Sequence, residues 1–509
     1  MSSVRNFDGV KVTAKCFDAM IADEIKTRIT GNFPFTPTDD QRRATDVFAC
    51  FVTDREAHSA MILRGSAGTG KTSLASGIVK TLVQYGQKVV LLAPTGRAAK
   101  VFALNSGHDA FTIHRSIYRQ KSGGQDDSAF NLGFNALHNA LFIVDECSMI
   151  SNSYNSNSVF GSGRLLDDLV QFVYSGTGCR LLLVGDGAQL PPVGDDFSPA
   201  LSAEMMSSYG LKVYEANLDE VLRQSRQSGI LMNATAIREM ISRDESTLLP
   251  KITLSGYADI CVVNGDELIE SLASSYAKVG IDETMVVSRS NKRANIFNMG
   301  IRNQVLGREE QLTTGDLLMV VKNKYLQTPS TGKPDADRSQ QAAETETQPT
   351  HSFIANGDRA MVVRIRNWCE LYGFNFADVL LRFPDYDDFE LQTTVIIDSL
   401  FSEAPALTGE QQQKLYVEVM ADYADIPQKQ KRMKALREDK HYNAVQIKYG
   451  YAVTCHKAQG GQWAHVYLDQ GYMTDDMLGT DYLHWLYTAF TRATEKLFLV
   501  NWPDKQLCL

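Results

Sequence analysis

The sequence predicts an α/β protein with two halves built on parallel sheets and a small antiparallel β insertion between them. Short apolar runs alternate with helix-length amphipathic stretches from about residue 60 to 190, and this alternation resumes near residues 285 and 465. Such a rhythm is typical of strands joined by crossover helices. Between the two regions, strand-like runs follow one another without a helix-length stretch, which favours antiparallel structure.

Each part of this prediction depends on particular runs. In the first half we assign strands to residues 60–63, 88–93, 141–146 and 180–186. In the second half we assign them to 285–288, 465–468 and 496–501, with a helix at 481–492. In the insertion we assign them to 316–321, 360–365 and 391–397.

Composition narrows the class of protein. The chain has 509 residues, enough for three or four domains, and its net charge of −9 argues against a globally basic nucleic-acid binder. Any polyanion must therefore meet a local basic channel. The eight cysteines form no CxxC pair, and the chain contains neither a signal-like N-terminus nor a long apolar stretch. We expect a cytoplasmic protein without a membrane segment.

Three segments depart from the α/β pattern. Residues 328–350 contain no aromatic or large aliphatic side chain, so we expect a mobile loop. Residues 408–440 are helix-like with a basic run near their end, which on its own favours a solvated helical face. Residues 122–137 contain Gly123, Gly124 and Gly133, and they form either a surface loop or a hairpin.

A phosphate-binding loop follows the first predicted strand. The sequence GSAGTGKT precedes a helix-compatible run, the context in which backbone N–H groups at a helix N-terminus bind phosphate. Lys71 is expected to neutralise the β and γ phosphates, and the Thr72 hydroxyl to ligate Mg²⁺. The residues assigned to nucleotide binding are Gly65, Ser66, Ala67, Gly68, Thr69, Gly70, Lys71 and Thr72.

Polar side chains end two further strands of the first half. Asp145 and Glu146 follow one strand and Gln189 follows another, at the sheet edge where parallel strands bind ligands. Asp145 is expected to be a direct or second-shell Mg²⁺ ligand, Glu146 the base that orients or deprotonates water, and Gln189 a γ-phosphate sensor. Taken alone, an acidic pair is more often a cap or turn, and a loop glutamine more often has no function.

Seven segments in order resemble the motifs of superfamily 1 helicases. They are GSAGTGKT, APTGRAAK (93–100), TIH (112–114), DECSM (145–149), GDGAQLPPVG (185–194), VTCHKAQG (453–460) and YTAFTRA (487–493). GDGAQLPPVG and HKAQG resemble superfamily 1B, the RecD-like branch, and in particular the compact Dda-type phage helicases. The resemblance implies an ATP-dependent DNA helicase that moves 5′ to 3′ on single-stranded DNA and unwinds duplex.

The resemblance also implies an architecture of two RecA-like P-loop domains with parallel sheets, a small inserted β-barrel domain and a short hairpin insertion. Its expected parts are an N-terminal extension (1–34), a first RecA-like domain (35–225) with a pin insertion (115–138), a second RecA-like domain in two parts (226–310 and 451–509), and the inserted barrel (311–450). The mobile loop and the helical segment within 311–450 are not signatures of the family.

Further site residues come only from the resemblance. Gln41 takes the place that contacts adenine, and Arg223 and Arg492 the places of two arginines that reach the γ-phosphate, beside Lys71, Glu146 and Gln189. A surface ion pair is the alternative for each arginine. The expected strand contacts are Pro94, Thr95, Arg97, Thr112, His114, Asn291, Thr454, His456 and Lys457. Thr95 has the alternative of a helix cap, and the rings of His114, Tyr118 and Trp463 either stack on bases or belong to the core.

The expected cofactors are ATP and Mg²⁺, and the expected partners are single-stranded DNA, duplex junctions and single-strand-binding or replication and repair proteins. We expect a monomer. Two other functions stay open: an RNA or RNA–DNA hybrid helicase, and a nucleotide-switched DNA-binding ATPase that does not unwind.

Overall fold

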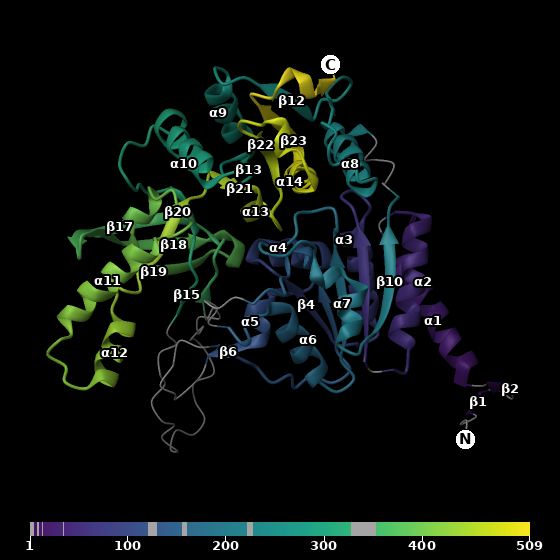
Figure 1. Cartoon of the computed structure of the whole chain (residues 1–509). Helices are drawn as coiled ribbons and strands as arrows, with labels where there is room; N and C mark the ends of the chain where they lie inside the picture. Colours follow the sequence, from purple (N-terminus) through teal and green to yellow (C-terminus); the bar gives the residue numbers. More distant parts are fainter. Residues whose placement is uncertain are drawn as a thin grey trace. The chain divides into compact units, whose positions relative to one another are not determined.

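The computed structural model describes residues 5–7, 10–12, 14–33, 35–56, 58–120, 130–154, 160–220, 227–326 and 353–508 (Figure 1). The chain divides into two compact units. The first unit, residues 1–307 with 451–509, holds both α/β halves, and the second unit is residues 308–450. The second unit begins three residues before the expected barrel domain.

The first half contains a six-stranded sheet in the order β10-β3-β9-β8-β4-β5, in which all neighbours are parallel. All four strands predicted here are present, and β5 and β10 were missed. Both missed strands lie at the edges of the sheet, where a strand pairs with a neighbour on one side only. An edge strand is more exposed than a central one and does not need a continuous apolar run. The elements are β3 (Ser59–Gly65), α3 (Lys71–Gln84), β4 (Val89–Ala93), α4 (Gly96–Ser106), β5 (Ala110–Thr112), α5 (Ile113–Ile117), β8 (Leu141–Val144), α6 (Leu165–Ser175), β9 (Arg180–Gly185), α7 (Ala203–Ser208) and β10 (Lys212–Leu218).

Two helices precede this sheet and help to bury it. They are α1 (Ala14–Gly31) and α2 (Asp39–Thr53), and the short strands β1 (Arg5–Phe7) and β2 (Val10–Val12) lie before them. α2 begins at a capping box in which Thr38 and Gln41 exchange hydrogen bonds between side chain and backbone. Phe48 of α2, Leu63 of β3 and Ile78 of α3 belong to one core, which packs both helices against the sheet.

The expected hairpin insertion is present as β6 (Tyr118–Gln120) paired antiparallel with β7 (Phe130–Leu132). Residues 121–129, between the two strands, lie outside the described residues. Phe130 is buried, whereas Phe134 is 85% exposed.

The second half contains a five-stranded parallel sheet in the order β12-β23-β22-β13-β21. The three predicted strands form its centre, and the missed strands β12 and β21 are its short edges. The elements are α8 (Gly229–Ser242), β12 (Ile260–Val263), α9 (Leu268–Val279), β13 (Thr284–Ser288), α10 (Asn291–Gly300), β21 (Ala452–Thr454), α13 (Cys455–Ala458), β22 (Trp463–Asp469), α14 (Thr480–Phe490) and β23 (Ala493–Val500), with β11 (Ile252–Thr253) paired to β24 (Leu507–Cys508).

The second unit is built on a closed barrel of β14 (Leu317–Val320), β17 (Arg359–Leu371), β18 (Phe374–Phe383), β19 (Phe389–Ile396) and β20 (Val445–Tyr449). Neighbouring strands are antiparallel except β19 and β20, which are parallel. A short pair, β15 (Lys324–Tyr325) and β16 (Phe353–Ile354), flanks the predicted mobile loop at 328–350, which lies outside the described residues. The predicted β-barrel is therefore present.

The helix-like segment at 408–440 is two helices, α11 (Gly409–Asp422) and α12 (Lys429–Glu438), which Figure 1 shows in light green beside the barrel. Thr408 caps α11, and Pro427 lies between the two helices, where its ring opposes a continuous helix. Leu415, Val419 and Leu436 pack on barrel residues, so the pair has a buried face. Among the described residues, no helix has the length and apolarity that a bilayer crossing requires.

Candidate functional site

The phosphate-binding loop joins β3 to α3. Gly68 and Gly70 have φ values of 76° and 79°, the left-handed region that favours glycine. The loop closes around the predicted lysine, because Lys71 Nζ donates to the backbone oxygens of Gly65 at 2.6 Å and Ser66 at 3.0 Å. The sequence therefore forms the predicted loop, with its amide groups at the start of α3.

The predicted acidic pair stands at the end of β8. Burial, together with the neighbouring Glu146 carboxylate, raises the pKa of Asp145, whose Oδ1 accepts from the Glu146 backbone N–H at 2.9 Å. Glu146 has a φ of 51°, a conformation that is uncommon for residues with a side chain and that concentrates at functional sites. The fold thus holds the Glu146 carboxylate in a defined position at the sheet edge.

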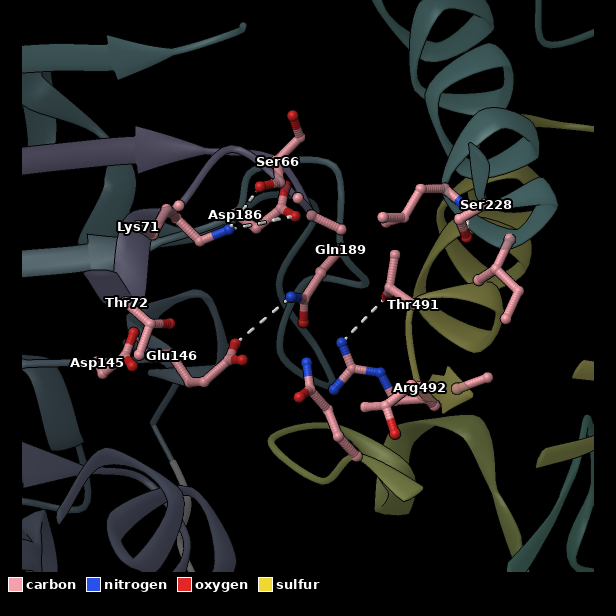
Figure 2. Close-up of a pocket in the computed structure, with 18 residues that line it drawn as sticks. Ser66, Lys71, Thr72, Asp145, Glu146, Asp186, Gln189, Ser228, Thr491 and Arg492 are labelled. Atoms are coloured by element: carbon pink, nitrogen blue, oxygen red, sulfur yellow. Dashed lines mark hydrogen bonds and ion pairs between the residues drawn. The ribbon is translucent and has the colours of Figure 1, made fainter. Parts of the chain in front are cut away.

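The predicted sensor glutamine meets the predicted base. Gln189 is 4% exposed, and its Nε2 lies 3.4 Å from Glu146 Oε2, as Figure 2 shows. Its Oε1 is buried and accepts no hydrogen bond from the described residues. The amide therefore has one end directed to the carboxylate and an acceptor available to a donor such as water.

One cavity of about 370 Å³ brings these residues together with the second half. Figure 2 shows Lys71, Thr72, Asp145 and Glu146 on one side and Arg492 on the other. The lining residues of the first half are Ser66, Ala67, Gly68, Gly70, Lys71, Thr72, Asp145, Glu146, Asp186 and Gln189, and those of the second half are Ser228, Ile230, Leu231, Gln462, Thr491, Arg492, Ala493 and Thr494. A ligand in this cavity would touch both halves.

The two predicted arginines differ in what the structure describes. Arg492, two residues after the end of α14, is 1% exposed, and its guanidinium donates to Thr488 O, Gly461 O and Thr491 Oγ1 at 2.9–3.1 Å. These three bonds fix the charge at the cavity wall. Arg223 lies outside the described residues.

Gln41 lies beneath the phosphate-binding loop and is fully buried. Its Nε2 donates to Thr69 O at 2.9 Å, and its Oε1 accepts from the Thr38 backbone N–H at 3.0 Å. Gln41 is not among the residues that line the cavity, so its contact with adenine stays a prediction.

Two residues of the second half that the sequence analysis missed reach the phosphate-binding loop. Tyr487 of α14 has its Oη 2.8 Å from the Ala67 backbone nitrogen, and Arg238 of α8 has its Nη1 2.6 Å from Ser66 Oγ. Tyr487 lies within the YTAFTRA motif, which offered a signal. Arg238 lies in no motif, so only the fold reveals its place.

The loop that carries Gln189 is bonded to the second half on both sides of the glutamine. The Ala188 oxygen lies 2.8 Å from His484 Nδ1, and the Leu190 N–H donates to Thr488 Oγ1 at 2.7 Å. Gln459, at the end of α13, donates to Leu190 O at 2.6 Å. The loop that carries Gln189 is therefore in direct contact with α14 and with the end of α13.

The predicted strand-contact residues include three threonines at the starts of helices. Thr95 Oγ1 accepts from the Ala98 N–H at 3.2 Å at the start of α4, directly after Pro94, and Thr112 caps α5 in the same way. Thr454 precedes α13 without a side-chain cap. The hydroxyl oxygens of Thr95 and Thr112 therefore accept capping bonds, while the hydroxyl hydrogens and the other N–H groups at the helix starts can still donate.

Arg97 connects the two halves. Its guanidinium donates to the Gln462 backbone oxygen, lies 3.5 Å from a Glu283 carboxylate oxygen and stacks over the Trp463 ring with its Cζ 4.7 Å from the ring centroid. Trp463 is 3% exposed, so its ring belongs to the core, and the interpretation that it stacks on a base is wrong. These contacts give the Arg97 charge a role between the two halves, and a DNA contact by Arg97 would have to compete with them.

His114 and Tyr118 belong to an aromatic cluster with Phe160. Their ring centroids lie 4.8–5.7 Å apart, and Tyr118 donates to buried Asp168 at 2.7 Å. Burial lowers the pKa of His114 to about 4. The ring of Tyr118 is buried and belongs to the hydrophobic core, which was the alternative to stacking on a base. His114 packs against the same core.

The remaining predicted strand contacts lie at the starts of helices in the second half. Asn291 is the first residue of α10 and is half-buried. His456 is exposed and Lys457 is half-buried on α13, where desolvation lowers the pKa of Lys457. Neighbouring Arg293 is held by two hydrogen bonds of 2.6–2.8 Å to the buried carboxylate of Asp469.

Comparison with protein families gives two matches. A model described as an AAA domain matches residues 38–246, and one described as a UvrD-like helicase C-terminal domain matches residues 449–500. Together they cover about half of the chain, one match in each α/β half.

Individual proteins are also similar. The ATP-dependent RecD2 DNA helicase of Deinococcus radiodurans is 30% identical over 177 residues, which are 35% of this chain but only 21% of that protein. The ATP-dependent DNA helicase dda of Enterobacteria phage T4 is 22% identical over 351 residues, 66% of this chain and 74% of that protein. Among solved structures, the Pif1 helicase from Bacteroides in complex with ADP-AlF3 and ssDNA is 14% identical, covers 93% of this chain and 95% of its own, and gives a TM-score of 0.45.

Proposed function

We propose that this chain, which belongs to the superfamily 1B (RecD-like) helicases, is an ATP-dependent DNA helicase that moves 5′ to 3′ along single-stranded DNA and unwinds duplex. The observation that carries the proposal is the single cavity lined by Lys71 of one half and Arg492 of the other. Phosphoryl transfer needs positive charge on both sides of the γ-phosphate. A nucleotide between these side chains links its hydrolysis to the relative position of the halves.

The cavity suits Mg²⁺ as well as ATP. Thr72 and Asp145 offer a hydroxyl and a carboxylate, the hard oxygen ligands that Mg²⁺ takes when phosphates complete its shell. These two residues would hold the ion, which when bound neutralises charge on the β and γ phosphates.

The chain's own groups account for activation of water. Among the described residues that line the cavity, Glu146 is the only carboxylate that Gln189 contacts. Because Gln189 Nε2 lies 3.4 Å from Glu146 Oε2, one water molecule can contact both side chains. Glu146 accepts the proton of the attacking water, and the Gln189 oxygen orients it. Arg492, and Arg223 by resemblance, stabilise the charge that develops on the γ-phosphate.

The hydrogen bonds of the sensor loop support coupling to a strand. Leu190 is bonded to Gln459 at the end of α13, and α13 begins at the predicted strand contact Thr454. A change at Gln189 would therefore shift the predicted contacts of one half relative to those of the other. Changes in the relative position of the halves during the ATP cycle then move the protein along the DNA strand.

The direction of movement and the choice of DNA come from the resemblance. An RNA or RNA–DNA hybrid helicase stays an alternative, as does a nucleotide-switched DNA-binding ATPase without unwinding. Glu146, Gln189 and Arg492 together favour turnover over a switch, because nucleotide binding alone does not require all three.

Unwinding of partial duplexes tests the proposal. The substrates carry either a 5′ or a 3′ single-stranded tail, in DNA and in RNA, and the Lys71→Ala variant is the control without turnover. We expect unwinding only of the substrate with the 5′ DNA tail. Unwinding from the 3′ tail would refute the direction, and ATP turnover without unwinding of any substrate would favour the switch.

A further inference from the structure

The side chain of Tyr487 connects the second half to the phosphate-binding loop. It is 1% exposed, its Oη accepts from the Ala67 N–H at 2.8 Å, and its hydroxyl donates to Asp186 Oδ2 at 2.6 Å. Burial, together with the Asp186 charge, raises the pKa of Tyr487 well above its ordinary value, so the phenol keeps its proton. The hydroxyl therefore uses its one hydrogen on Asp186 and its oxygen on Ala67.

The Ala67 amide has a second use. Ala67 lines the cavity, and the backbone N–H groups of such a loop are the donors that hold nucleotide phosphates. One N–H group makes one strong hydrogen bond at a time. A phosphate oxygen on the Ala67 amide therefore takes the place of the Tyr487 oxygen.

The surroundings of Tyr487 strengthen this connection. Asp186 Oδ2 lies 3.9 Å from Lys71 Nζ, so the tyrosine and the lysine share one carboxylate. Arg238 of α8 donates to Ser66 Oγ at 2.6 Å, one residue before Ala67. The second half thus holds two consecutive residues of the loop from two helices.

We propose that Tyr487 is a positioning residue that docks α14 on the phosphate-binding loop through the same amide that takes a phosphate, so that docking and nucleotide binding compete. This inference rests on the proposed nucleotide site. Binding of ATP breaks the Tyr487–Ala67 hydrogen bond, and release of nucleotide restores it. The docked state therefore opposes nucleotide binding and favours release.

The sign of an affinity change tests the proposal. In Tyr487→Phe the competing acceptor is gone, so a fluorescent non-hydrolysable ATP analogue should bind about three- to tenfold more tightly, the range that one net hydrogen bond is worth. Structural damage to the loop would weaken binding instead. Weaker or unchanged binding in this variant overturns the proposal.

Tyr482 supplies a matched control on the same helix. Its hydroxyl is equally buried and is bonded at 2.9 Å to Gln470 and Gln506, neither of which lines the cavity. Tyr482→Phe should bind the analogue within about twofold of the wild type, and an equal gain in both variants would overturn the role of Tyr487.

The Lys71→Ala variant separates this proposal from the proposed nucleotide site. If wild type binds the analogue and Lys71→Ala does not, the site stands, and the Tyr487→Phe result decides the docking alone. If Lys71→Ala binds as well as wild type, the phosphate-binding loop is not the site and both proposals fail.

Discussion

The nucleotide cavity and the predicted DNA-contact residues, here called the track, were both predicted from the same motifs. The two sets of residues differ in what their side chains do in the structure. The track comprises Pro94, Thr95, Arg97, Thr112, His114, Asn291, Thr454, His456 and Lys457. Of the cavity residues, Lys71, Glu146, Gln189 and Arg492 converge on one space. Of the track residues, Thr95 and Thr112 cap helices and Arg97 joins the two halves. The motif residues of the cavity are therefore brought together by the fold, whereas several predicted DNA-contact residues also have structural roles.

The chemistry of each site explains the difference. Phosphoryl transfer needs particular charged and polar groups at fixed points, so residue type and motif together define the site. The phosphate backbone of a DNA strand can be bound by backbone N–H groups and helix N-termini, which residues of almost any type supply. A threonine that caps a helix for structural reasons then looks the same in sequence as one that contacts a phosphate.

The largest expected effect lies in the cavity. Arg492→Ala should lower the rate of ATP turnover by about 10³- to 10⁵-fold, because the charge on the far side of the γ-phosphate is lost. Steady-state ATPase assays measure the rate, and strand affinity in the absence of nucleotide should change by less than about threefold. Arg492→Lys is the control, which keeps the charge without the planar fork that Arg492 uses on Gly461 and Thr488. A loss of less than tenfold in Arg492→Ala would remove Arg492 from the catalytic set.

Buried central strands are easier to predict from sequence than exposed edge strands. Central strands such as β3 and β9 were predicted because both their faces are buried and their apolar runs are continuous. The edge strand β10, with the sequence KVYEANL, escaped because it is half exposed and carries charge. In the site, Arg238 was missed because it lies in no motif and its partner, the Ser66 hydroxyl, belongs to the other half. Tyr487 lies within a motif, but the motif does not reveal that its hydroxyl reaches the Ala67 amide.

Lys457 and Arg97, two positively charged residues of the track, should differ in their contribution to DNA binding. Lys457→Ala should weaken binding of single-stranded DNA and reduce the slope of log affinity against log salt by about 0.7, the value for one phosphate contact. Arg97→Ala should leave that slope unchanged, because its guanidinium is already paired with Gln462, Glu283 and Trp463. Fluorescence anisotropy of a labelled oligonucleotide across a salt series measures both. If Arg97→Ala reduces the slope and Lys457→Ala does not, the assignment of the two residues is reversed.

The smallest expected effect is on the pH dependence of stability in a His114 variant. It tests whether this track residue belongs to the hydrophobic core. Burial lowers its pKa from 6.5 to about 4, so between these values the unfolded chain binds a proton that the folded chain does not. Its contribution to stability is therefore present above pH 6.5 and is lost as pH falls toward 4. Between pH 7 and 5 the melting temperature of His114→Gln should fall less than that of wild type, by on the order of 2 °C. A charged His114 on the strand would instead raise the affinity of wild type for DNA below pH 6.5, and the variant would lose that rise.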